Sequence, residues 1–301
     1  MSSAFAIGID VGGTAIKVGS FDREGRCLGS LKISTPQPSK PQTVLHQLVD
    51  LVQQLDPKGH CVAIGVGVPG PSDADCRIAL RSINLPGWVQ IPVADELEQL
   101  LHKPVVVEND ANCAGVGEAW LGAGQACHSM ILLTLGTGVG GAIVLNGELF
   151  SGSYGAAGEL GLVVLYPDGP PCNSGNNGSL EQYVSATAIA RRTGMGVREL
   201  DRRARAGDAT ALEWWHRIGT DLGVGLSSSI YVLAPEVVAI GGGVSQSADL
   251  FLPAAIAEIE RRVMPTSRMG LRVVPAQLGN QAGCVGAARL AWQHGDRCSS
   301  S

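Results

Sequence analysis

The sequence predicts an α/β fold of two domains. Short apolar runs alternate along the chain with amphipathic segments, a pattern typical of strands followed by helices. A strand, a glycine-rich turn and a second strand occur twice, over residues 7–19 and 130–146, which we interpret as a duplicated hairpin with one copy in each domain. A length of 301 residues also favours two domains.

The expected elements follow from apolar periodicity and from the residues that stop it. Pro69-Gly70 ends a buried strand, Pro235 ends a long helix, and the apolar residues between 44 and 55 have helical spacing. Strands are expected at 5–9, 15–21, 61–68, 105–108, 237–240 and 271–274, and helices at 44–55, 110–120, 181–193, 209–233, 248–263 and 282–292. A glycine-containing linker near 115–128 separates a domain of residues 1–115, joined by the final helix at 282–301, from a larger domain of residues 116–281.

Composition excludes several classes of protein. The net charge of −5 and the pI near 5.7 argue against nucleic acid and anionic membranes as partners, and favour small molecules. No apolar run approaches the ~20 residues of a membrane helix, and Asp10 interrupts the one that could resemble a signal peptide. The eight cysteines form no CxxC pair. We therefore expect a cytoplasmic protein with reduced thiols.

The glycine turns are better suited to phosphate than to a dinucleotide fold. Gly65-x-Gly67-x-x-Gly70 and Gly136-x-Gly138-x-x-Gly141 match GxGxxG, but Pro69 interrupts the first and the second runs into a strand, so neither opens a helix. Two strand–turn–strand units can instead present backbone N–H groups to phosphate oxygens. The candidate phosphate residues are Asp10, Gly12, Gly13, Thr14 and Lys17 in the first unit and Gly136, Thr137 and Gly138 in the second.

Asp10 precedes the first turn, where a carboxylate would repel phosphate unless a cation lay between them. This suggests Mg²⁺ held by Asp10, through water or directly, although Asp10 satisfying turn amides is an alternative. Lys17 either adds a positive charge to the phosphate site or points to solvent.

Asp110 begins a helix directly after a strand, and by itself it is expected to be an N-cap. Beside a phosphate site it has a second possible role, because an ionised carboxylate can accept the proton of a hydroxyl that attacks a phosphoryl group. Asn109 offers a donor and an acceptor, which suits a polyol substrate.

Together these segments resemble the ROK family of bacterial sugar kinases and repressors. The resemblance rests on GIDVGGTAIKVG (8–19), INLPGW (83–88), VENDANCAGVGEAW (107–120), LGTGVGGAIV (135–144), GAAGELG (155–161) and IGGGVS (240–245), which occur in the family's order over nearly the whole chain.

The resemblance implies an actin and hexokinase-like (ribonuclease H-like) fold, with two α/β domains closing over a cleft that binds ATP and sugar. It makes Asp110 the catalytic base of a glucokinase-type kinase that uses ATP and Mg²⁺, and it suggests a homodimer. The sugar-contacting positions are then Gly70, Asn84, Asn109, Asp110, Glu159 and Glu181, and the adenosine packs at Gly241, Gly242 and Gly243.

One segment departs from the family. Where most members carry a histidine and three cysteines that bind a structural zinc, this chain has Leu162, Cys172, Ser174 and Ser179. A tetrahedral zinc site needs four ligands, so we expect no zinc. Ser179-Leu180-Glu181-Gln182 fits a capping box, which predicts Ser179 as the N-cap of the next helix. The histidine that Leu162 replaces also contacts sugar in the family, and Leu162 cannot hydrogen-bond, so a sugar hydroxyl near the anomeric end needs another partner or water.

Three alternatives to an ATP-dependent glucokinase stay open. The donor could be polyphosphate, although the sequence has no extended basic track for it, and the sugar could be another hexose. A sugar-sensing ROK regulator is the non-enzyme alternative. Such repressors carry a helix-turn-helix ahead of the kinase-like body, whereas here the phosphate motif begins at Gly8.

Overall fold

A computed structural model describes residues 4–82 and 85–299 of the chain. They form two compact α/β units. Unit 1 comprises Met1–Ala126, Glu148–Ala157 and Asn280–Ser301, and unit 2 comprises Cys127–Gly147 and Gly158–Gly279. Unit 1 thus extends past the predicted boundary at residue 115, because the helix that begins at Asp110 packs closely against the C-terminal helix. The C-terminal helix is grouped with the N-terminal residues in unit 1.

The sheet of unit 1 has the order β3-β2-β1-β4-β7. The antiparallel strands β1 (Ala6–Val11), β2 (Ala15–Phe21) and β3 (Cys27–Ser34) are followed by β4 (Ile64–Val68) and β7 (Val105–Asn109), which run parallel to β1. A small separate sheet pairs β5 (Ala79–Arg81) with β6 (Val89–Ile91). The parallel strands end at one edge of the main sheet. The predicted phosphate and acceptor residues of unit 1 lie at or just after those strand ends.

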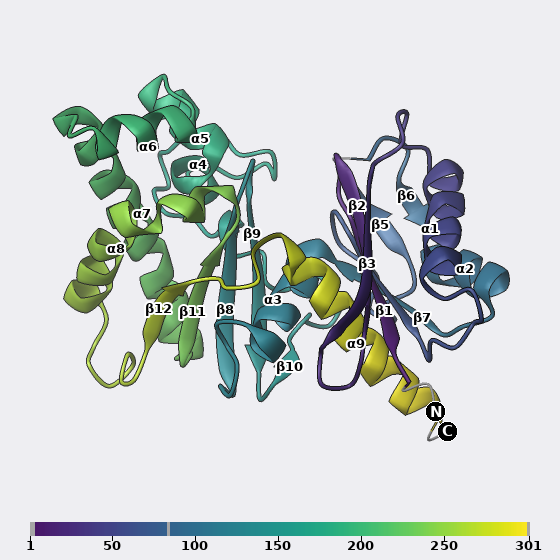
Figure 1. The fold of residues 1–301 in the computed structure, drawn as a ribbon. Helices are drawn as coiled ribbons and strands as arrows, with labels where there is room; N and C mark the ends of the chain where they lie inside the picture. The colour runs from purple at the N-terminus through teal and green to yellow at the C-terminus, as the bar shows by residue number, and fades with distance from the viewer. Residues whose placement is uncertain (1–3, 83–84, 300–301) are drawn as a thin grey trace. The chain divides into compact units, whose positions relative to one another are not determined.

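Residue alternation explains how helices cover the two faces of this sheet (Figure 1). Apolar residues such as Ile7, Ile9 and Val66 join one core with α1 (Pro41–Leu55) and α2 (Val93–Leu101). On the other face, Gly8 and Gly65 lie under α9 (Ala282–Ser299), which also packs on α3 (Asp110–Leu121). A Cβ at Gly65 would lie 1.9 Å from the carbonyl oxygen of Ala287. The first GxGxxG match therefore contains a contact surface for a helix.

The second five-stranded sheet has the order β10-β9-β8-β11-β12, of which β9, β8, β11 and β12 belong to unit 2. Strand β8 (Ser129–Leu135) pairs antiparallel with β9 (Val139–Leu145) and parallel with β11 (Val237–Gly241), which pairs parallel with β12 (Arg272–Pro275); β10 is Glu148–Leu149. In both sheets a hairpin is thus followed by two parallel strands. The predicted duplication of a hairpin therefore corresponds to a similar strand order in the two sheets.

The helices of unit 2 enclose its main core. Helices α7 (Ala209–Leu233) and α8 (Ala248–Arg262) pack together, and Trp215 and Phe251 stack with ring centroids 5.8 Å apart. The remaining helices are α4 (Glu181–Val184), α5 (Ala186–Thr193) and α6 (Val197–Arg205), with short 3₁₀ turns at Leu160–Leu162, Gly243–Ser247 and Gly279–Gln281. The single helix expected at 181–193 is two helices, because the Ser185 hydroxyl caps a new start by accepting from the N–H of Ala188.

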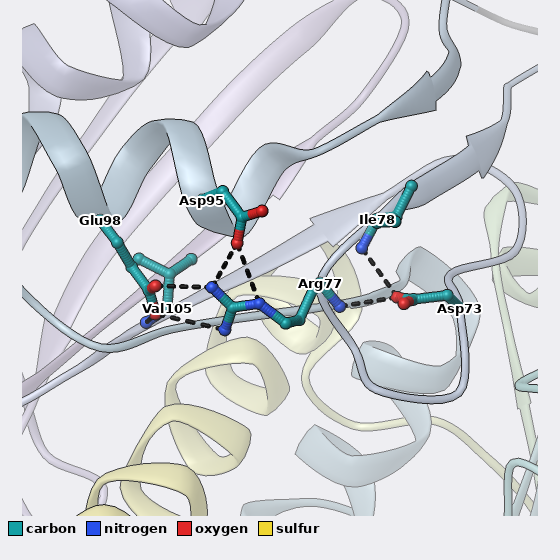
Figure 2. A network of polar contacts seen from close by, with 6 residues as sticks. All are labelled: Asp73, Arg77, Ile78, Asp95, Glu98 and Val105. Atoms are coloured by element: carbon teal, nitrogen blue, oxygen red, sulfur yellow. Dashed lines mark hydrogen bonds and ion pairs between the residues drawn. The ribbon is translucent and has the colours of Figure 1, made fainter.

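A polar network fixes the loop that follows β4 in unit 1 (Figure 2). The Asp73 carboxylate accepts the backbone N–H groups of Arg77 and Ile78, both at 2.7 Å. The Arg77 guanidinium pairs with Asp95 and Glu98 of α2, and Glu98 also accepts the N–H of Val105 at 2.9 Å. The network therefore ties residues 73–78 to α2 and to the start of β7. Across the stretches 4–82 and 85–299, no helix combines the length and apolar character needed to cross a membrane.

Candidate active site

The parallel strands of unit 1 bring its candidate residues to one sheet edge. Asp10 of β1 is aligned with Gly67 of β4, and Gly67 is aligned with Glu108 of β7. One residue further along, Val68 is aligned with Asn109. Because residues in such a row point to the same face, Asp10 and Glu108 project toward the side covered by α3 and α9. The predicted phosphate and acceptor residues of this unit therefore lie at one edge.

The first glycine turn is held by backbone contacts and by β3. The N–H of Gly12 donates to the carbonyl of Ala15 at 3.0 Å, and the N–H of Thr35 donates to the carbonyl of Thr14 at the same distance. The Thr35 hydroxyl also donates to the carbonyl of Gly12. These contacts hold the turn that contains Gly13 in a fixed conformation. Thr35 lies outside the motif, so sequence reasoning missed it.

Lys17 contacts Asp10. Its ammonium nitrogen lies 2.7 Å from Asp10 Oδ2, and the two residues are direct partners across the β1–β2 hairpin. The Lys17 side chain thus pairs with Asp10 and does not simply point to solvent, with 27% of its surface exposed. One oxygen of Asp10 is thus engaged by a cation that belongs to the protein.

Asn109 is the N-cap of α3, which corrects the prediction that Asp110 is the cap. The Asn109 Oδ1 accepts the N–H groups of Ala111 and Asn112 at 2.9 and 3.1 Å, and Nδ2 donates to the carbonyl of Gly70 at 3.1 Å. Asp110 is instead the first residue of the helix, and its Oδ1 lies 2.9 Å from the N–H of Ala111. The cap falls one residue earlier because Asn109 keeps an extended ψ of 142°. The Asn109 amide also ties Gly70 to the start of α3.

Three carboxylates of unit 1 lie near Cys113 in α3. Burial raises the pKa of the Cys113 thiol, and the charges of Glu108, Asp10 and Asp110 raise it further. Asp10 also lies at the start of α9, where a Cβ at Gly283 would be 3.0 Å from its Cγ. The N-terminus of α9 stabilises negative charge there. Asp10 and Asp110 therefore share one region of unit 1.

The glycine turns of unit 2 lie together at the ends of β8 and β11. Gly241 is aligned with Thr134 of β8, and Gly242 has a φ of +84°. A Cβ at Gly242 would lie 2.4 Å from the carbonyl oxygen of Leu135, so only glycine fits. The predicted phosphate turn at 136–138 and the predicted adenosine segment at 241–243 are therefore neighbours.

Glu181 supports the predicted phosphate turn of unit 2. Its Oε2 accepts the N–H of Val139 at 2.9 Å, and a Cβ at Gly138 would lie 2.4 Å from the same oxygen. The Thr187 hydroxyl donates to the carbonyl of Thr137, and the N–H of Ala186 donates to that of Gly136. The segment containing the starts of α4 and α5 thus fixes the turn. Sequence reasoning predicted Glu181 as a sugar contact and missed its contact with Val139.

Glu159 and Glu181 interact electrostatically within unit 2. Although much of the Glu159 residue is exposed, partial burial of its carboxyl group raises its pKa, and the charge of Glu181 raises it further. In the range between the ordinary pKa and the raised value, the folded state holds a proton that the unfolded state has released. The contribution of Glu159 to stability is therefore lost as the pH rises through its folded pKa.

Replacing Glu181 with Gln is expected to lower the pKa of Glu159, because a repelling charge is removed. The shift is measured by NMR titration of carboxyl-labelled glutamate, with Glu260→Gln on the exposed side of α8 as the control. An unchanged Glu159 titration in the Glu181 variant would contradict the coupling.

The segment that departs from the family is ordered by its own backbone. The N–H of Cys172 donates to the carbonyl of Asn176 at 2.7 Å, the N–H of Gly178 donates to that of Pro170 at 2.8 Å, and Ser179 forms a β-bridge with Val164. Burial raises the pKa of the Cys172 thiol, but hydrogen bonding from Ser174 and Ser179 outweighs it, so the pKa lies below its ordinary value. Cys172, Ser174 and Ser179, which are three of the four positions where the resemblance places zinc ligands, therefore lie close together.

The predicted Ser179 cap is wrong. Helix α4 begins at Glu181 with Leu180 at the N-cap position, and no side chain caps it. The bridge to Val164 turns the Ser179 side chain into the interior, where its hydroxyl is fully buried. No described protein group meets that hydroxyl in good hydrogen-bond geometry, although it lies near enough to the Cys172 thiol to affect its pKa. Within 4–82 and 85–299, no group of three or more His, Cys, Asp or Glu is arranged to hold a metal ion.

Asn84, a predicted sugar contact, lies outside the described residues.

Sequence reasoning missed Glu108, which is buried directly before Asn109 and Asp110. A charged residue at the end of an otherwise apolar strand, Val105–Val107, was the available signal.

Comparison with known proteins gives a consistent result over nearly the whole chain. The profile of the ROK family matches residues 6–294. The chain is 36% identical to a glucokinase of Halalkalibacterium halodurans, over 97% of this chain and 96% of that protein.

Solved structures show the same similarity. A ROK family glucokinase from Streptomyces griseus in complex with glucose and AMPPNP is 34% identical, with a TM-score of 0.81 and coverage of 96% of this chain and 100% of that one. A ROK hexokinase from Thermus thermophilus is 33% identical, with a TM-score of 0.88 and coverage of 99% and 100%. The predicted actin and hexokinase-like α/β fold is thereby confirmed.

Proposed function

We propose that this chain, which belongs to the ROK family and is a sugar kinase, transfers the γ-phosphoryl group of ATP to a hexose, with glucose as the expected acceptor. The observation that carries the proposal is the pairing of Asp110 with the capping residue Asn109 at the sheet edge that also holds Asp10. The similarity to a glucokinase solved with glucose and AMPPNP supports the choice of sugar and donor.

In the proposed reaction Asp110 is the general base. The hydroxyl oxygen farthest from the anomeric carbon attacks the γ-phosphorus, its proton passes to the Asp110 carboxylate, and the bond between that phosphorus and the ADP oxygen breaks. Asn109 uses Oδ1 and one N–H of Nδ2 within the protein, which leaves a second N–H to orient a sugar hydroxyl. Gly70, Asn84, Glu159 and Glu181 remain the proposed sugar contacts.

The two glycine turns are proposed to bind the phosphates through backbone N–H groups. Thr14 and Thr137 add hydroxyls, and Gly241, Gly242 and Gly243 leave space for the adenosine. In unit 1, Lys17 neutralises Asp10, so the carboxylate does not repel the nucleotide.

The residues present fit Mg²⁺ held through water. One oxygen of Asp10 contacts Lys17, which leaves the other to accept hydrogen bonds from water around the ion. When bound with ATP, Mg²⁺ neutralises charge on the phosphate oxygens. Glu159, which lies near Glu181 in unit 2, is not part of this proposed metal site.

A screen of the purified protein tests the proposal. Glucose, mannose and N-acetylglucosamine are each combined with ATP or polyphosphate in the presence of Mg²⁺, with and without a zinc-selective chelator. We expect the highest kcat/KM with glucose and ATP, and no loss of activity on zinc chelation. Absence of phosphoryl transfer to any hexose would overturn the proposal. A preference for polyphosphate, or for another hexose, would change only the donor or the acceptor. Light scattering on the same sample tests the proposed homodimer.

A further inference from the structure

The carboxylate of Glu108 is buried next to the proposed base. Glu108 is the penultimate residue of β7 and is only 2% exposed. Burial raises its pKa, although hydrogen bonds from Asn112, Asn109 and Ser72 act in the opposite direction. A buried carboxylate is costly unless its hydrogen bonds are satisfied, so its partners are informative.

The partners of Glu108 come from three parts of unit 1. Oε1 accepts the N–H of Asn109 at 2.7 Å, the side-chain amide of Asn112 at 3.0 Å and the hydroxyl of Ser72 at 3.1 Å. The Cys76 thiol lies 3.8 Å from Oε2. One side chain therefore links the end of β7, the first turn of α3 and the loop after β4.

That loop is itself held rigidly, which makes it a useful anchor. Asp73 and Arg77 fix it through the network of Figure 2, which reaches α2 and the start of β7. Gly70 lies in the first part of this loop, has a φ of +93° and accepts a hydrogen bond from Asn109. Glu108 thus adds a second connection between this loop and the segment that carries Asn109 and Asp110.

We propose that Glu108 is a positioning residue, whose carboxylate holds the Asn109–Asp110 helix start in register with Gly70 and the loop after β4. It contacts no substrate in this proposal and acts only through its neighbours. The proposal rests on the proposed role of Asp110 as the base. Because small displacements of a catalytic group are costly, loss of this link is expected to reduce turnover strongly.

The variants follow from the hydrogen-bond pattern. Gln has one oxygen that can accept the three donors now on Oε1, whereas Met has a similar length and accepts none of them well. We expect E108M to lower kcat about 100-fold. The kcat of E108Q should be about tenfold higher than that of E108M, or more. The Kd of the nucleotide, measured by calorimetry, should change little in either variant.

Glu118→Met is the matched control. Glu118 is fully buried in the same helix, and its carboxylate accepts the N–H of Ala123 near the other end. Both Met variants are therefore expected to lower the melting temperature, but only E108M should lower kcat per folded molecule. Equal kcat losses in E108M and E118M would indicate general destabilisation and overturn the proposal.

Hydrogen exchange gives a readout that does not depend on activity. The N–H groups of Ala111 and Asn112, which donate to Asn109, should exchange faster in E108M than in E108Q or the native protein. If E108M does not fold, Ser72→Ala removes one donor and leaves the carboxylate, and it should show the same changes on a smaller scale. Native exchange rates at these amides in every variant would overturn the proposal.

The two proposals fail differently. An inactive native protein with faster exchange in E108M would contradict the proposed reaction and retain the positioning role. If the native protein is active but E108M keeps the native kcat, the proposed reaction is retained and the positioning role of Glu108 is contradicted.

Discussion

Replacing Asp110 with Asn is expected to lower kcat by about 100- to 10,000-fold, the range typical of a lost general base. The side chain keeps its size, and its Oδ1 can still contact the N–H of Ala111, so the start of α3 should be preserved. An amide cannot take the proton of the attacking hydroxyl. Sugar affinity, measured by calorimetry, should therefore be retained while steady-state turnover is lost.

Asp50→Asn is a suitable control for Asp110→Asn, because Asp50 is exposed on α1, within unit 1 but away from the sheet edge that carries the site. It should leave turnover and stability near their native values. Near-native turnover in the Asp110 variant would remove Asp110 as the base.

Replacing Gly65 with Ala is expected to cause the largest loss of stability, about 3 kcal/mol in the free energy of unfolding, the upper part of the usual range for an overpacked interior. The added Cβ would lie 1.9 Å from the carbonyl oxygen of Ala287, and a backbone atom in the middle of α9 cannot move aside independently. Urea denaturation, followed by circular dichroism, measures the change.

Gly196→Ala provides the comparison for Gly65→Ala, since nothing lies within 4 Å of a Cβ at Gly196, and its φ of −66° suits alanine. Its effect on the unfolding free energy should be a few tenths of a kcal/mol, as for an N-cap position without a side-chain bond. Equal urea midpoints and equal slopes for the two variants would show that α9 can move away from the sheet without loss of stability.

Elements with strong burial or clear end signals were predictable from the sequence. Every residue of Val237–Gly241 is buried, and its apolar run was predicted as a strand. Helix α7 was predicted with its observed bounds, because Pro235 stops it. Among the elements that were missed, three have clear physical reasons. Strand β3 is an edge strand with mostly exposed residues, α6 is highly charged, and α2 is short.

The residues of the candidate site were predictable where they lie at the end of a β-strand. Asp10, Asn109 and Asp110 each occur at the end of a β-strand or immediately after it, and parallel strands place such ends together. Contacts that depend on register or on distant segments were not predictable. The pairing of Lys17 with Asp10 depends on the length of the hairpin turn, and the contact of Thr35 with Gly12 depends on where β3 lies.

The place of α9 has a consequence for synthesis on the ribosome. The helix covers the face of the β1–β4 sheet that carries Gly8 and Gly65, yet it is translated long after both strands. Strands β1 and β4 are translated early, and about two hundred residues lie between β4 and α9. The sheet face that carries Gly8 and Gly65 is therefore exposed to water while those residues are added. Chains arrested before residue 282 should therefore leave unit 1 open to proteases even when unit 2 has folded.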